Sequence, residues 1–221
     1  MKKFLVLLMT IVLVMTTVVA CIKDDKKSKT KRRETVEGTW EAEIEIGEYL
    51  TEMLTSDESF AELADFFELK NCTLVYEMEI NDDGTYKLSV DKNSAKDAAD
   101  DIRKAFKQCM EDYFKDYIEG QNSSMTVDEL LEESGISMDD LLDAYMGEDN
   151  ENYVKLFEEM ATEGYWKVED DKFYTAETED DFDEDEYDEF ELDGDSLTFT
   201  DGSGEDAEEM QFIYPMEFTR K

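Results

Sequence analysis

Histidine is absent from this chain, and its absence removes several kinds of chemistry. A Ser-His-Asp triad, a Cys-His pair and a zinc site with histidine ligands all require the imidazole ring. Three cysteines remain, at Cys21, Cys72 and Cys109. The sequence identifies no base for Cys72 to work with, so we expect that the protein is not an enzyme.

Carboxylates are the most abundant reactive groups, with 61 Asp and Glu against 22 Lys and Arg. Because pairs of them occur throughout, no single pair stands out for acid–base catalysis. A calcium-binding EF-hand loop needs Gly at its sixth position and Glu at its twelfth. Two acidic stretches depart from this pattern. In the one that begins at Asp91, the sixth and twelfth positions are Lys96 and Ile102, and in the one that begins at Asp183 they are Asp188 and Gly194. We expect no metal site and no cofactor. A solvated acidic surface over residues 177–191 is favoured over weak calcium binding.

The first twenty residues have the layout of a secretory signal peptide. Lys2 and Lys3 precede an apolar run over residues 4–19, which a small residue and a cysteine follow. The sequence Val18-Val19-Ala20-Cys21 resembles the lipobox of bacterial lipoproteins. That resemblance implies cleavage before Cys21, a thioether lipid on its sulfur and anchoring on the outer face of the cell membrane. The alternative is an uncleaved membrane helix, but the run is shorter than the ~20 residues that a span needs.

Charge is distributed unevenly after the cleavage point. Seven of the basic residues lie between positions 22 and 33: Lys23, Lys26, Lys27, Lys29, Lys31, Arg32 and Arg33. We expect residues 21–36 to form a flexible basic tether, which an anionic leaflet attracts by about 1 kcal/mol per basic residue. The alternative is a plain solvated spacer. The rest of the chain is strongly acidic, which argues against a nucleic-acid partner because phosphate binding needs a basic face.

Hydrophobic patterns predict an antiparallel sheet interrupted by helices in one domain, residues 37–221. About eight strands are expected: one at 40–46, three hairpins with turns at 81–84, 169–172 and 193–195, and a last strand at 210–218. Helical periodicity covers 48–69 and a larger insertion at 94–163. The insertion carries an apolar stripe of Ile102, Phe106, Cys109, Tyr113 and Tyr117. A stripe of this kind must pack on an apolar surface, and we expect the sheet to provide it. Capping residues Thr126 and Ser137 mark two short helices within the insertion.

Cys72 and Cys109 remain after lipidation of Cys21. In an oxidising compartment they either form a disulfide or stay as two buried thiols. Two cysteines make no disulfide framework, which favours thiols.

The two ends of the domain carry a further signature. Gly38-Thr39-Trp40 opens the first strand, and Arg220 ends the last one on the same face as Phe218. This resembles the lipocalin superfamily, in which a Gly-x-Trp on the first strand packs against an arginine near the end of the barrel. The resemblance implies a closed antiparallel barrel that Trp40 and Arg220 help to close. The helical insertion departs from the lipocalin pattern, and with it the expected fold class is α+β. The alternative is a twisted open sheet covered by helices.

These expectations combine into a membrane-anchored binding module of the cell envelope. A hollow barrel would bind a small apolar molecule or a lipid, as the lipocalin resemblance implies. The alternative is a structural or protein-interaction lipoprotein whose barrel is filled by its own side chains, for which 13 Phe, 11 Tyr and 2 Trp supply enough volume. The partners expected are the membrane, through the lipid on Cys21, and an apolar ligand if the barrel is hollow.

Overall fold

The computed structural model describes residues 36–56, 60–121, 123–204 and 214–221. The predicted signal peptide, Cys21 and most of the basic tether lie outside these ranges. The described chain divides into two compact units. Of the described residues, the barrel unit contains 36–44, Val75–Asp91 and those of Glu159–Lys221, and the helical unit contains those of Glu45–Leu74 and Lys92–Glu158.

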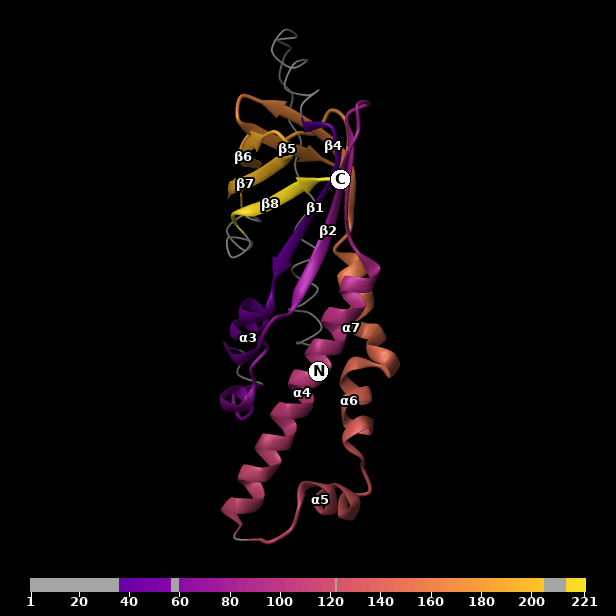
Figure 1. The fold of residues 1–221 in the computed structure, drawn as a ribbon, viewed down its shortest axis with the longest axis vertical. Helices are drawn as coiled ribbons and strands as arrows, with labels where there is room; N and C mark the ends of the chain where they lie inside the picture. Colours follow the sequence, from indigo (N-terminus) through magenta and orange to yellow (C-terminus); the bar gives the residue numbers. More distant parts are fainter. Residues whose placement is uncertain (1–35, 57–59, 122, 205–213) are drawn as a thin grey trace. The chain divides into compact units, whose positions relative to one another are not determined.

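Eight antiparallel strands form a closed barrel in sequence order, which confirms the predicted fold class (Figure 1). They are β1 (Gly38–Glu45), β2 (Thr73–Ile80), β3 (Thr85–Val90), β4 (Thr162–Glu169), β5 (Lys172–Ala176), β6 (Tyr187–Asp193), β7 (Ser196–Ser203) and β8 (Met216–Arg220). The pair β1–β8 completes the ring, with Trp40 opposite Arg220 in the register. Alternation of buried and exposed residues along these strands reflects one inward and one outward face.

Up-and-down connectivity places particular segments at the same end of the barrel. The start of β1, the β2–β3, β4–β5 and β6–β7 turns, and the end of β8 all lie at one end, which we call the floor end. The chain therefore enters the described structure at Val36 on the floor end, beside three hairpin turns.

The helical unit forms from two separate stretches of the chain. Its elements are α3 (Gly47–Ser56), the 3₁₀ turn η2 (Ala64–Phe66), α4 (Lys92–Gly120), α5 (Val127–Ser134), α6 (Met138–Met146), the 3₁₀ turn η3 (Glu148–Asn150) and α7 (Glu151–Glu159). Thr126 and Ser137 cap α5 and α6 through capping boxes, as their spacing predicts.

The apolar stripe of α4 packs within the helical unit, except for Tyr117, which is 51 % exposed. The Phe106 ring lies 5.9 Å from that of Phe60 and 5.0 Å from that of Phe67. The Cys109 thiol lies 3.6 Å from the Leu63 carbonyl oxygen, to which it donates. Residues 60–67 therefore provide apolar cover that the sequence pattern had assigned to the sheet.

Two predicted boundaries are wrong, and a third lies partly outside the described ranges. The helix expected over 48–69 ends at Ser56, and η2 follows it. The helical insertion ends earlier than residue 163, because β4 begins at Thr162. Gly164 lies inside that strand, where a Cβ would come within 2.3 Å of the Ala176 carbonyl oxygen. The last strand is β8 alone; residues 210–213 of the predicted run lie outside the described ranges.

Candidate functional site

The floor end is closed by Trp40 and Arg220. Trp40 is fully buried, and the Arg220 guanidinium carbon lies 4.0 Å from the centre of its ring. The indole N–H donates to the Val36 carbonyl at 2.8 Å, and Arg220 Nη1 donates to the Glu37 carbonyl at 2.6 Å. Stacking and hydrogen bonds thus attach the first described residues to the last strand. The stacking of a cation on an indole ring is itself favourable.

Gly38 is required by this arrangement. Its φ of +144° lies in a region that side chains disfavour, and a Cβ at this position would come within 2.4 Å of Arg220 Nη1. The glycine of the Gly-x-Trp sequence therefore leaves room for the arginine of the last strand.

The inward face of the barrel is lined by aromatic rings that contact one another. Trp166 stacks on Phe173 at a centroid distance of 5.8 Å, and Phe199 meets Phe173 at 5.5 Å and Phe218 at 5.8 Å. Phe190 joins the group at 6.4 Å from Phe173. Phe173 and Phe218 are each only 2 % exposed. These rings come from β4, β5, β6, β7 and β8, so the protein's own side chains occupy the space between these strands.

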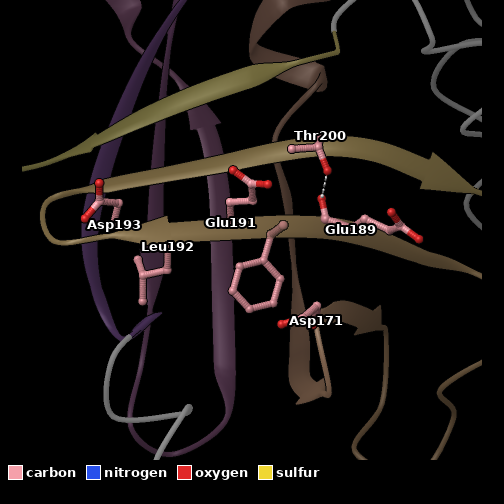
Figure 2. Close-up of a pocket in the computed structure, with 7 residues that line it drawn as sticks. Asp171, Glu189, Glu191, Leu192, Asp193 and Thr200 are labelled. Carbon is pink, nitrogen blue, oxygen red and sulfur yellow. Dashed lines mark hydrogen bonds between the residues drawn. The ribbon is translucent and has the colours of Figure 1, made fainter.

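An open hollow of about 740 Å³ runs along β6 (Figure 2). It is lined by Asp171, Glu189, Phe190, Glu191, Leu192, Asp193 and Thr200. Glu189, Glu191 and Asp193 are exposed, whereas Phe190 is buried. In Figure 2, Glu191 and Asp193 lie on the side of the strand opposite Leu192. The hollow therefore follows the edge of β6 and presents carboxylates to the solvent, which suits a cationic partner better than an apolar one.

A partly buried carboxyl group, that of Asp188, lies near the other end of β6. Tyr214 donates a short hydrogen bond to Asp188, and burial raises the pKa of both groups. Their positions are 26 residues apart, so no local pattern in the sequence signalled the pair.

We expect Asp188→Asn to stabilise the protein increasingly as the pH rises. An aspartate whose pKa is raised in the folded state loses its stabilising contribution as the pH rises through that pKa, and asparagine does not titrate. The amide oxygen of the substituted side chain can still accept the Tyr214 hydrogen bond. Urea unfolding midpoints of both proteins, measured between pH 4 and pH 8, should diverge progressively. Glu191→Gln, an exposed change on the same strand, provides the control; a pH-independent difference for Asp188→Asn would contradict the assignment.

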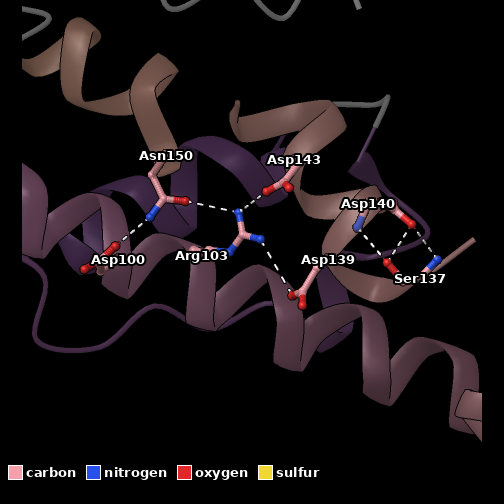
Figure 3. Close-up of polar contacts among 7 residues, drawn as sticks. All are labelled: Asp100, Arg103, Ser137, Asp139, Asp140, Asp143 and Asn150. Carbon is pink, nitrogen blue, oxygen red and sulfur yellow. Dashed lines mark hydrogen bonds and ion pairs between the residues drawn. The ribbon is translucent and has the colours of Figure 1, made fainter. Parts of the chain in front are cut away.

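In the helical unit, Arg103 joins three elements through polar contacts (Figure 3). Its Nη1 lies 2.8 Å from an Asp143 carboxylate oxygen and donates to Asn150 Oδ1 at 3.3 Å, while its Nη2 lies 3.7 Å from Asp139. Asn150, which is 3 % exposed, donates in turn to Asp100 at 2.6 Å. Arg103 thus connects α4 to α6 and η3, and the sequence alone did not single it out.

We expect Arg103→Met to lower the free energy of unfolding of the helical unit by about 1–2 kcal/mol. The change keeps the apolar stem but removes charge-assisted bonds to Asp143 and Asn150, which are worth about 1.5–3 kcal/mol when desolvated and less at this partly exposed site. Lys104→Met removes an exposed ion pair with Asp101 on the same helix and should change stability little. Loss of helical circular dichroism on heating measures the stability of both variants. Equal losses of stability would show that the contacts of Arg103 contribute no more than the exposed ion pair of Lys104.

Cys72 and Cys109 are free, buried thiols. Burial raises the pKa of Cys72 to about 12 and that of Cys109 to about 11, with Asp101 and Asp112 adding to the respective effects. The thiolate is the reactive form of cysteine, so both side chains are inert at neutral pH. Cys72 packs against Ala98 of α4, and Cys109 lies in that helix and packs against Leu63.

Within the described ranges, no group of three or more cysteine, aspartate or glutamate side chains is placed to hold a metal ion. No helix in the described part of the chain is long and apolar enough to cross a membrane. No protein-family model, curated protein or solved structure matches this chain. Its function is therefore inferred from its own residues and geometry.

Proposed function

We propose that this protein is a lipid-anchored lipoprotein of the cell envelope whose filled barrel serves as a rigid support for surface contacts with other proteins. The observation that carries this proposal is the aromatic packing between β4, β5, β6, β7 and β8. Binding pockets for small molecules enclose about 300–1,000 Å³ and bury most of the ligand. Contacts of the Phe199 ring with Phe173 and Phe218 on the inward face support a filled interior, and the hollow along β6 is open and acidic.

The anchoring part of the proposal rests on the N-terminal sequence. A short basic head, an apolar run and Val18-Val19-Ala20-Cys21 occur in the order that export and lipidation require. A basic tether follows, and the acidic domain comes after it. An anionic leaflet attracts the tether and repels the domain, so the domain stands away from the membrane with its surface accessible.

Cys21→Ser tests the anchor. The variant should remain an unprocessed precursor or lack lipid, because the thiol is the acceptor. Metabolic labelling with a fatty-acid analogue, followed by mass spectrometry of the N-terminal peptide, measures the outcome. Cys72→Ser, which alters a buried thiol elsewhere, is the matched control and should retain the label. A Cys21→Ser protein that matures and carries the same label would overturn the assignment.

A quenching titration tests whether the barrel is filled. The chain has 2 Trp, and both Trp40 and Trp166 are buried in the barrel unit. Brominated fatty acids quench indole fluorescence on contact, so a ligand inside the barrel would be detected directly. We expect no saturable quenching of the full-length protein in detergent. Saturable one-to-one quenching would overturn the filled barrel and favour the apolar-ligand binder.

A further inference from the structure

A groove in the helical unit opens between the end of α4 and the beginnings of α5 and α6. Its volume is about 550 Å³. Four apolar side chains belong to its lining: Ile118 of α4, Met125 just before α5, Val127 of α5 and Met138 of α6. Ile118 is buried, whereas the other three are partly exposed. The groove therefore leaves apolar surface in contact with the solvent, which is typical of a site for another molecule.

Hydrogen bonds fix the backbone that carries these side chains. The Met125 N–H donates to Ser123 Oγ at 3.2 Å, and the Ser123 N–H donates to the Ile118 carbonyl at 3.3 Å. Val127 and Met138 are the first residues of α5 and α6, and each follows a capping box. Because the walls of the groove are ordered before anything binds, a partner would lose little affinity to the ordering of this surface.

Charge around the groove selects the kind of partner. From position 111 to position 143 the sequence has eleven acidic residues and one basic residue, Lys115, which pairs with Asp112 at 3.0 Å. Glu119 and Asp128 belong to the lining itself. An anionic leaflet is repelled by such a surface, and so is a second copy of this chain, whose net charge is -39. A cationic segment of another protein is attracted.

We propose that this groove binds a cationic amphipathic helix of a partner protein. Large apolar side chains on one face of that helix enter the groove, and lysine or arginine side chains beside them face Glu119 and Asp128. Met125 and Met138 suit this role, because the flexible thioether side chain adapts to partners of different shape. The inference rests on the proposed role in protein contacts. It needs neither the lipid on Cys21 nor the filled barrel, so its test and the tests of those two claims can fail independently.

Fluorescence anisotropy of a labelled model peptide tests the proposal on the mature full-length protein in zwitterionic detergent. The peptide is helical, with leucine at i, i+4 and i+7 and lysine on the flanking positions. We expect saturable one-to-one binding. A second peptide keeps the lysines and carries alanine in place of leucine, and it should bind about tenfold more weakly. Equal binding of the two peptides would overturn the proposal, because charge alone would then account for the interaction.

Substitutions in the apolar lining locate the site. Met125→Ser/Met138→Ser should weaken binding of the leucine peptide about tenfold, because two apolar contacts are lost. Ile136→Ser is the matched control: it removes a 43 % exposed apolar side chain from the α5–α6 connection, outside the lining, and should leave the affinity unchanged. Helical circular dichroism checks that each variant is folded. Equal affinities in the control and in the methionine variant would overturn the proposal.

Substitutions of exposed carboxylates provide a second test that leaves the apolar lining intact. Glu119→Gln/Asp128→Asn should weaken binding of the leucine peptide about threefold at low salt, because two charges that face the peptide are lost. Glu132→Gln/Glu133→Gln removes the same charge from α5 outside the lining and should have a smaller effect. Equal effects of the two pairs would show that the peptide responds only to the overall charge, which would overturn the proposal.

Methyl NMR of methionine-labelled protein locates the bound peptide directly. The signals of Met125 and Met138 should shift during the titration. The signals of Met53 in α3 and Met216 in β8, which are also partly exposed, should stay in place. Shifts that spare Met125 and Met138 would overturn the proposal. So would a dimer in sedimentation that dissociates in Met125→Ser/Met138→Ser, because the groove would then be an interface between two copies of this chain.

Discussion

Replacement of Trp40 by alanine is expected to lower the free energy of unfolding of the barrel by about 3–5 kcal/mol, the usual loss for a buried large aromatic ring. Trp40 is fully buried at the floor end. Its ring supports Arg220, and its indole N–H satisfies the Val36 carbonyl. Urea unfolding, monitored by the remaining Trp166 fluorescence, measures the loss. A cost below about 1 kcal/mol, typical of surface sites, would contradict the burial.

A double-mutant cycle separates contact with Arg220 from burial. If the guanidinium and the indole interact, the effects of Trp40→Ala and Arg220→Ala should deviate from additivity by about 0.5–2 kcal/mol. Arg220 also holds the Glu37 carbonyl and Asp195. Pairing Arg220→Ala with Asp195→Ala therefore gives a control cycle that reports the exposed ion pair, for which we expect a smaller coupling. Additive effects in the first cycle would show that the ring stacking contributes nothing to barrel closure.

Replacement of Phe173 by alanine is expected to cost about 3–5 kcal/mol as well, because it removes a ring from the centre of the barrel. Phe173 contacts the rings of Trp166, Phe190 and Phe199. Phe173→Leu retains most of the apolar volume and should cost less, which provides the matched control. Unfolding free energies from urea titrations at fixed salt measure both variants.

The same variant has a consequence for ligand binding. A cavity lined by apolar side chains stays dry and accepts small apolar molecules such as benzene. We expect Phe173→Ala to be stabilised by benzene and the wild type to be unaffected, with thermal unfolding as the measurement. Stabilisation of the wild type would indicate an existing cavity between these strands and would contradict the filled barrel.

Local patterns were sufficient for much of the fold. Strand alternation depends on neighbouring residues, and the β2–β3 hairpin was predicted from its apolar faces and the turn at 81–84. Capping boxes at Thr126 and Ser137 involve residues only three positions apart, so the beginnings of α5 and α6 could also be predicted from the sequence. The pairing of Trp40 with Arg220 came from the lipocalin resemblance and strand parity, since nothing local relates residues at opposite ends of a domain.

The sequence by itself determined the pattern of strands and helices, the absence of histidine chemistry and the separation of a basic tether from an acidic domain.

Tertiary structure decided what covers each apolar surface. Helical periodicity at 60–67 gave way to η2, whose neighbouring rings Phe60 and Phe67 pack on Phe106 of α4. Arg103 with Asn150 and Asp188 with Tyr214 are pairs separated by 47 and 26 residues. Such contacts form only when distant segments meet, because a side chain's surroundings depend on the whole chain whereas its periodicity depends on a few neighbours. For the same reason composition showed that aromatic residues were numerous, but only the tertiary structure showed that rings from five strands contact one another on the inward face.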